Sequence, residues 1–266
     1  MNKYSLAATV LWMVWGCYAL PFKTAKGDEM KNLESYGSLI VPEKKEIRGA
    51  VIFYPPATGE KGQQRSEAER LSKLGIASFL YLPPYARKNN TGGFKNVPGE
   101  VELWREAKAE YGNLLKLLKD HFKNDSLQIA IVGKNLGGSV AAYSQDKNVT
   151  CAIVTGSVPL LSEFWVKSSH PVAVESRNGV TQSELEHFQK ETSRFDLIHT
   201  VKEIPSKVLF QFGTQDPWIE KNQATRFEKS VSKETHKIEW IEDDHSMNST
   251  QSIQNRIKFL NECFER

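Results

Sequence analysis

Three short stretches in the second half of the chain combine glycines, a carboxylate and a histidine in a pattern suited to nucleophilic chemistry. GKNLGG follows an apolar run and places Asn135 at the centre of a tight turn. FGTQDPW places Asp216 just after a second apolar run, and DDHSM places His245 just after a third. An aspartate that orients a histidine, which takes a proton from a neighbouring hydroxyl, is a recurring device for attacking a carbonyl carbon.

The stretch LQIAIVGKNLGGSVAA at 127–142 predicts a strand that turns sharply into a helix. Its glycines let strand and helix pass closely, and the central residue takes a strained backbone conformation. The spacing is that of the nucleophile elbow G-x-S-x-G, with Asn135 where the nucleophile would stand. Choosing Ser139 as the apex would spoil the strand–turn–helix register, so we favour Asn135. Its amide nitrogen is delocalised and cannot form an acyl-enzyme.

In the order elbow, acid, histidine, the sequence resembles the α/β-hydrolase fold family of esterases and lipases over roughly residues 37–266. GKNLGGSVAA, FGTQDPW and DDHSM carry the resemblance. It implies catalytic positions at Asn135, Asp216 and His245. It also implies an oxyanion hole formed by the backbone N–H groups of Leu136 and Ala57, although two prolines precede Ala57 where the family commonly has His-Gly.

The elements around these motifs predict an α/β fold with a mostly parallel, doubly wound central sheet. Buried strands are expected at 36–41, 48–54, 76–82, 129–132, 150–155, 208–212 and 238–241. Amphipathic helices are expected at 63–74, 100–122, 182–193 and 250–264. Strands that alternate with helices favour parallel pairing. Residues 157–200 interrupt the alternation and, by the resemblance, form a small cap. Its Phe164 and Trp165 suggest an apolar pocket wall, with core packing as the equal alternative.

The first 20 residues carry one lysine and then an apolar run, a pattern typical of an export signal. The run is short for a transmembrane span. VWGC also matches a bacterial lipoprotein signal, with Cys17 as the lipid-bearing residue. The alternatives are an uncleaved N-terminal anchor and an apolar tail packed on the domain. Residues 21–35 are expected to be a tether and 36–266 the domain, in a protein that is exported and either lipid-anchored in the cell envelope or secreted.

Composition narrows the class of partner. The 266 residues are 39% hydrophobic and 25% charged, with a net charge of +3 and no basic tract. We therefore expect no nucleic-acid partner, but a small-molecule or lipid/ester ligand and possible membrane attachment through the N-terminus. Cys17, Cys151 and Cys263 form no metal spacing and no disulfide framework, so Cys151 and Cys263 are expected to be buried core residues. No metal or organic cofactor is implied.

Three functions remain open. The first is a protein related to esterases and lipases whose catalysis is impaired because Asn135 replaces the nucleophile. The second is an active hydrolase in which the His245–Asp216 pair activates water directly. The third is a non-enzymatic binding or scaffold protein of the cell surface. Family relatives with aspartate at the apex cleave epoxides or carbon–halogen bonds, and conversion of Asn135 to aspartate would create that nucleophile.

Overall fold

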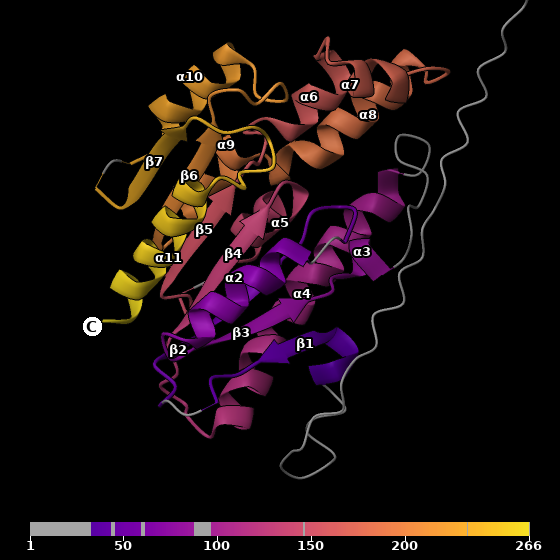
Figure 1. Ribbon diagram of the computed structural model, residues 1–266. Helices are drawn as coiled ribbons and strands as arrows, with labels where there is room; N and C mark the ends of the chain where they lie inside the picture. The colour runs from indigo at the N-terminus through magenta and orange to yellow at the C-terminus, as the bar shows by residue number, and fades with distance from the viewer. Residues whose placement is uncertain are drawn as a thin grey trace, which may run out of the picture.

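A seven-stranded sheet forms the centre of the molecule (Figure 1). The computed structural model describes residues 33–43, 46–59, 62–87, 97–145, 147–232 and 234–265. The strands are β1 (Gly37–Ile40), β2 (Gly49–Tyr54), β3 (Ile76–Tyr81), β4 (Ile129–Lys134), β5 (Cys151–Thr155), β6 (Lys207–Gly213) and β7 (His236–Ile241). Their order is β1-β3-β2-β4-β5-β6-β7, and only β1 runs antiparallel. The predicted mostly parallel sheet is confirmed.

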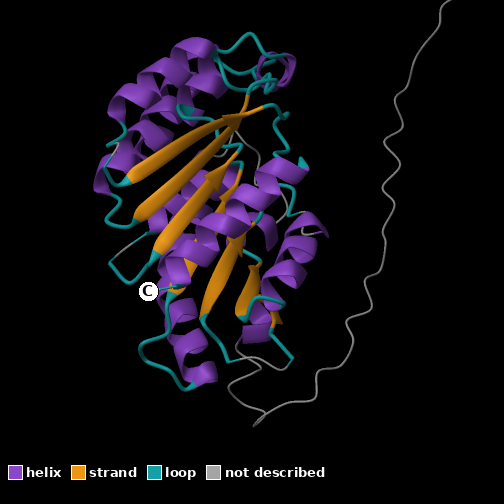
Figure 2. Cartoon of the chain, turned by 60° about the vertical axis from the view of Figure 1, so that its left-hand side comes forward, coloured by secondary structure: helices purple, strands orange, loops and turns teal. Residues whose placement is uncertain are grey.

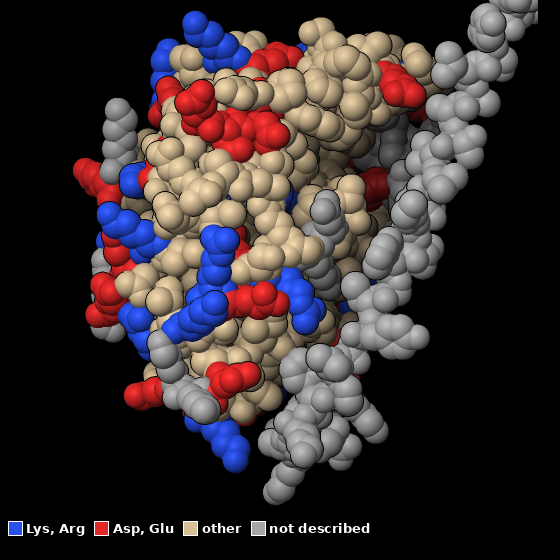
Figure 3. Space-filling view, in the orientation of Figure 1, with Lys and Arg blue, Asp and Glu red and all other residues tan. Residues whose placement is uncertain are grey.

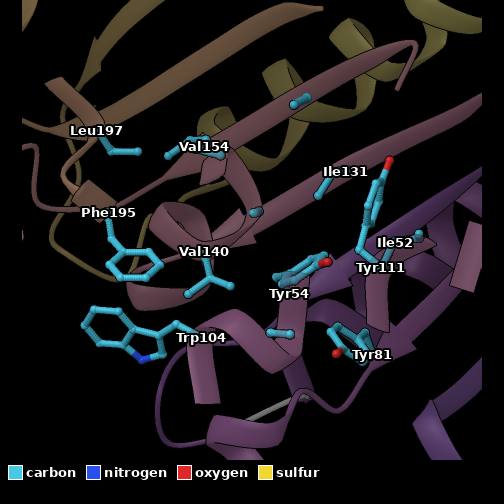
Figure 4. Packing of buried hydrophobic residues seen from close by; sticks show 14 of the residues in the cluster. Ile52, Tyr54, Tyr81, Trp104, Tyr111, Ile131, Val140, Val154, Phe195 and Leu197 are labelled. Carbon is cyan, nitrogen blue, oxygen red and sulfur yellow. The ribbon is translucent and has the colours of Figure 1, made fainter. Parts of the chain in front are cut away.

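Helices cover both faces of this sheet (Figure 2). α2 (Gly62–Ser72) and α11 (Thr250–Phe264) cover one face, where Val51 and Phe53 of β2 join their apolar side chains. α4 (Val97–Phe122) and α5 (Leu136–Ser144) cover the other, where the alternate residues Ile52 and Tyr54 pack with Trp104 (Figure 4). Every residue of β2 is buried, because successive side chains point to opposite faces and neither face meets water.

The parallel strands bring their carboxyl ends to one edge of the sheet. Lys134, the last residue of β4, pairs with Thr155 at the end of β5, and Gly213 of β6 pairs with Ile241 of β7. The loops that follow β4, β6 and β7 therefore all start at this edge of the sheet. Ligands of open α/β sheets bind at this edge.

The segment between β5 and β6 folds into short helices beyond the carboxyl edge (Figure 1). They are α6 (Leu161–Lys167), α7 (Pro171–Ser176), α8 (Gln182–Thr192), η2 (Ser193–Phe195), α9 (Leu197–Thr200) and η3 (Val201–Glu203). Helices α3 (Pro84–Arg87) and α10 (Lys221–Ser230) complete the set. We refer to residues 157–200 as the cap. Phe164 and Phe195, both fully buried, anchor it to the core on the α4–α5 face.

A buried carboxylate joins two parts of the cap. The side chain of Asp196 accepts hydrogen bonds from the backbone N–H of Ser162 at 2.8 Å and from its hydroxyl at 2.6 Å. Burial raises the pKa of Asp196 to about 6, and the two bonds from Ser162 only partly oppose this. The native protein therefore takes up a proton at a pH where the unfolded chain stays ionised.

We expect this aspartate to make the protein more stable in mild acid. The stabilisation is complete below the unfolded pKa of about 3.9 and is lost as the pH rises through the native value, a change of up to about 3 kcal/mol in the free energy of unfolding. Denaturant unfolding at pH 5 and pH 7, compared with the same pair of measurements on Asp196→Asn, isolates this contribution. Identical pH dependence in the two proteins would contradict the expectation.

Cys151 and Cys263 are buried in the core, as expected, but the expectation that the cysteines form no disulfide was wrong. Cys151 at the start of β5 and Cys263 in the last turn of α11 form a disulfide, with 6.4 Å between their Cα atoms. Their sequence separation is 112 residues. The closing helix packs back on the sheet, and this tertiary contact is what brings the two sulfur atoms together.

The N-terminal boundary also moves slightly. Residues 33–36 form a helical turn, and Leu33 is buried in the core, so the domain includes the last part of the expected 21–35 tether. The expected signal segment with Cys17 lies outside the described residues. Within those residues no helix is both long and apolar enough to span a bilayer.

Candidate active site

The turn from β4 into α5 has the geometry that the glycine spacing predicts. Asn135 caps α5 with φ 53° and ψ −128°, a conformation that non-glycine residues rarely adopt. The flanking glycines allow close backbone approach. A Cβ atom on Gly137 would lie 2.2 Å from the carbonyl oxygen of Pro55, and one on Gly138 would lie 2.0 Å from Ser157 Oγ. Larger residues would therefore push the turn away from β2 and β5.

Hydrogen bonds join Asn135, His245 and Asp216 in series. Asn135 Nδ2 lies 2.5 Å from His245 Nε2, and His245 Nδ1 lies 2.8 Å from Asp216 Oδ2. The Asp216 side chain is fully buried, whereas 18% of the His245 side chain remains exposed. The buried acceptor requires a proton on Nδ1, which leaves the Nε2 lone pair facing Asn135.

The carboxamide of Asn135 also reaches the predicted oxyanion hole. The backbone N–H of Leu136 donates to Asn135 Oδ1 at 2.5 Å. Both neighbours agree on the orientation of the amide: its nitrogen donates to the imidazole and its oxygen accepts from the backbone. The opposite orientation would place two donors together at Leu136. A single side chain therefore stands at the predicted nucleophile position and also accepts the hydrogen of one predicted oxyanion donor.

Ala57 and Ser139, the other two residues considered for the site, take no part in this hydrogen-bonded series. Ala57 is exposed in the turn after β2, next to the Tyr54 and Pro55 carbonyls that abut Gly137, and its role as a second donor stays a prediction. Ser139 is 1% exposed within α5, and its hydroxyl has no hydrogen-bond partner in the described part of the chain. A buried hydroxyl at this position cannot take the place of the elbow residue.

Trp218 supports the histidine, and the sequence analysis gave it no role. Its ring stacks on His245 at 4.9 Å and on Phe164 of the cap at 5.1 Å, and its backbone N–H donates to Asp216 Oδ1 at 2.8 Å. It therefore ties the acid, the histidine and the cap together. A sequence signal for Trp218 was available, because this tryptophan is the last residue of the FGTQDPW motif.

A buried ion pair holds the loop that carries His245. Arg256 of α11 contacts Glu67 of α2 through two guanidinium nitrogens, and both side chains are at most 4% exposed. The same arginine donates to the carbonyl oxygen of Met247, two residues beyond the histidine. No sequence signal identified this arginine, because it sits on the apolar face of an amphipathic helix.

We expect Glu67→Gln to lower the free energy of unfolding by about 3 kcal/mol, because the substitution leaves the Arg256 guanidinium buried without a counter-charge. Chemical denaturation measures the loss. The matched control is the double variant Glu67→Leu with Arg256→Met, which replaces both charges by apolar side chains and should stay much closer to wild type. A single variant as stable as wild type would show that the pair is not needed.

The site contains no candidate metal centre in the portion of the chain that is described. No group of three or more histidine, cysteine, aspartate or glutamate side chains there is arranged to hold a metal ion.

No protein-family model matches the sequence, and no match was found among curated proteins. Solved structures are similar in fold. Acetyl xylan esterase 1 from Thermoanaerobacterium superposes with a TM-score of 0.62 at 13% identity, covering 85% of this chain and 78% of the esterase. The esterase domain of a Rhodothermus marinus protein gives 0.53 at 12% identity, covering 84% and 89%. Pyrococcus horikoshii acylaminoacyl peptidase gives 0.62 at 17% identity, covering 86% of this chain but only 39% of the peptidase. At these identities the likeness establishes the fold alone.

Proposed function

Starting from the α/β-hydrolase fold that this chain adopts, as the motif order predicted, we propose that it is related to ester and acyl hydrolases and that Asn135 impairs its catalysis. One observation carries the proposal. The Asn135 carboxamide bonds to His245 Nε2 on one side and to the Leu136 N–H on the other. The residue therefore lacks a nucleophilic oxygen and also fills the place of a reacting carbonyl.

Each of these two effects lowers the rate toward esters. Without a hydroxyl or thiol at the elbow, no acyl-enzyme can form. With its hydrogen bonded to Asn135 Oδ1, the Leu136 N–H is not available to stabilise the negative charge that develops on a substrate oxygen. Direct activation of water by the His245–Asp216 pair, the alternative mechanism, needs the Nε2 lone pair, and a water molecule must compete for it with the hydrogen bond from Asn135 Nδ2.

The proposed ligand is a small molecule or lipid that carries an ester or similar acyl group. Trp218, half-buried where the cap meets the histidine, supplies apolar surface beside the polar groups, and the fully buried Phe164 packs behind it. On the face seen in Figure 3, basic and acidic side chains intermingle, and the surface over the cap is mostly uncharged. Both features favour an apolar ligand over a nucleic acid.

We also propose an exported protein, in the cell envelope or secreted. Disulfides persist in oxidising compartments and are rare in the cytosol. The Cys151–Cys263 disulfide therefore supports the export signal expected in the first 20 residues. Attachment through Cys17 remains part of this proposal.

Ester hydrolysis by the wild-type protein and by Asn135→Ser tests the catalytic part. The wild-type protein should be silent on activated esters and the serine variant active. Wild-type turnover that His245→Ala abolishes would overturn the proposal in favour of water activation by the histidine pair.

A further inference from the structure

We propose that the site hydrolyses its own Asn135, converting the side-chain amide into a carboxylate. The inference rests on the same His245–Asp216 pair as the proposed function, but it concerns a reaction of the chain itself. Amide hydrolysis needs a donor on the carbonyl oxygen, an acid beside the leaving nitrogen and a group that orients that acid. The structure supplies all three around one carboxamide.

Each requirement corresponds to a contact in the structure. Asn135 Oδ1 accepts from the Leu136 N–H at 2.5 Å, which is the position of an oxyanion-hole donor. Asn135 Nδ2 lies 2.5 Å from His245 Nε2, where a proton can be delivered to departing ammonia. Asp216 Oδ2 lies 2.8 Å from His245 Nδ1 and stabilises the imidazolium ion that forms. The carboxamide thus lies as a bound amide substrate would.

The reaction needs only water. The hydrogen bond from Nδ2 to Nε2 opens as water attacks Cγ of Asn135 and passes a proton to His245 Nε2, while the carbonyl oxygen becomes an oxyanion held by the Leu136 N–H. The imidazolium ion then gives this proton to Nδ2 as the C–N bond breaks. Ammonia and a carboxylic acid are released, and the acid ionises near neutral pH. The exposed part of His245 gives water access to the site.

A backbone route to the same residue competes with this reaction. Asparagine can also lose ammonia when the next backbone nitrogen attacks Cγ, giving a cyclic imide that opens to aspartate and isoaspartate. At position 135 the Leu136 nitrogen lies 2.5 Å from Oδ1 and ψ is −128°, so this nitrogen is close to the carboxamide and the two routes are told apart by their products. Hydrolysis by the histidine pair gives aspartate alone, which separates the two routes.

The product would have a different chemistry from the asparagine form. An aspartate at the elbow is a nucleophile that can form a covalent ester with an electrophilic carbon. Water directed by His245 at the same Cγ atom would then cleave that ester. The step that creates the carboxylate is therefore the step that would regenerate it after each turnover, and the asparagine form is a precursor.

Mass spectrometry of peptides from the purified protein, incubated in oxygen-18 water at neutral pH, tests the proposal. We expect residue 135 of wild type to become aspartate with one heavy oxygen atom, or to be aspartate already when purified. His245→Gln and His245→Ala should convert at least about 100-fold more slowly. Asn178 is exposed and followed by Gly179, so it is the internal control: it should convert by the backbone route equally in all three proteins.

Three outcomes would overturn the proposal: an amide that persists at residue 135 in wild type, equal conversion in the folded His245 variants, or isoaspartate at this position. Thermal melts establish that the variants are folded. None of these outcomes contradicts the proposed function, which only the ester assays can refute. If the amide at residue 135 persists while Asn135→Ser hydrolyses esters, self-hydrolysis is refuted and the proposed relation to ester hydrolases stands.

Discussion

Replacing Asn135 with serine should turn a protein that is silent toward activated esters into an esterase, with kcat/KM at least about 10³-fold above wild type. The serine hydroxyl would lie beside His245 Nε2, which already has its lone pair directed at this position. The shorter side chain also withdraws the oxygen that now binds the Leu136 N–H. One substitution therefore adds the nucleophile and frees an oxyanion donor.

Three control variants separate these effects. Asn135→Ala frees the Leu136 N–H without adding a nucleophile, so activity in this variant would indicate attack by water. Adding Ser139→Ala to Asn135→Ser should leave esterase activity unchanged, because the Ser139 hydroxyl is buried in α5. Adding His245→Ala should abolish the activity. The assay uses short and long activated esters. A folded Asn135→Ser protein that hydrolyses none of them would refute the proposal that the rest of the hydrolase site is in place.

The second large effect concerns stability. Removing the disulfide with Cys151→Ser and Cys263→Ser should lower the free energy of unfolding by about 4 to 5 kcal/mol, because a cross-link over 112 residues strongly restricts the unfolded chain. Denaturant unfolding of the variant and of the oxidised protein measures the difference. Cys17→Ser is the matched control, since this residue is neither of the two disulfide cysteines. Equal unfolding midpoints, or free thiols at 151 and 263 in the native protein, would contradict the expectation.

The positions of the strands along the chain could be predicted from sequence because their signals are local. GAVIFY is apolar at every position, which is typical of a strand covered on both faces, and it forms β2. The order of elbow, acid and histidine was interpreted through the resemblance to the α/β-hydrolase fold family. As a rule, parallel strands end at one edge of the sheet. This rule accounts for the meeting of Asn135, Asp216 and His245 in space.

Features that depend on tertiary packing could not be predicted from the sequence. The Cys151–Cys263 pair depends on where the last turn of α11 lies against β5, and no spacing encodes this. The contact between Asn135 Oδ1 and the Leu136 N–H depends on one rotamer within a strained turn. Arg256 was hidden for a related reason, because the periodic pattern of its helix identifies the buried face but not a buried charge on it.

The disulfide also has a topological consequence. With the backbone between its two cysteines it closes a covalent ring that contains the cap, Asp216 and His245, whereas Asn135 lies outside this ring. A protease that cuts the exposed turn at residues 176–179 would open the ring without releasing either piece. The acid and the histidine would remain tethered to the strand beside the elbow. In surroundings rich in proteases, a nicked molecule can therefore keep both halves of its site together.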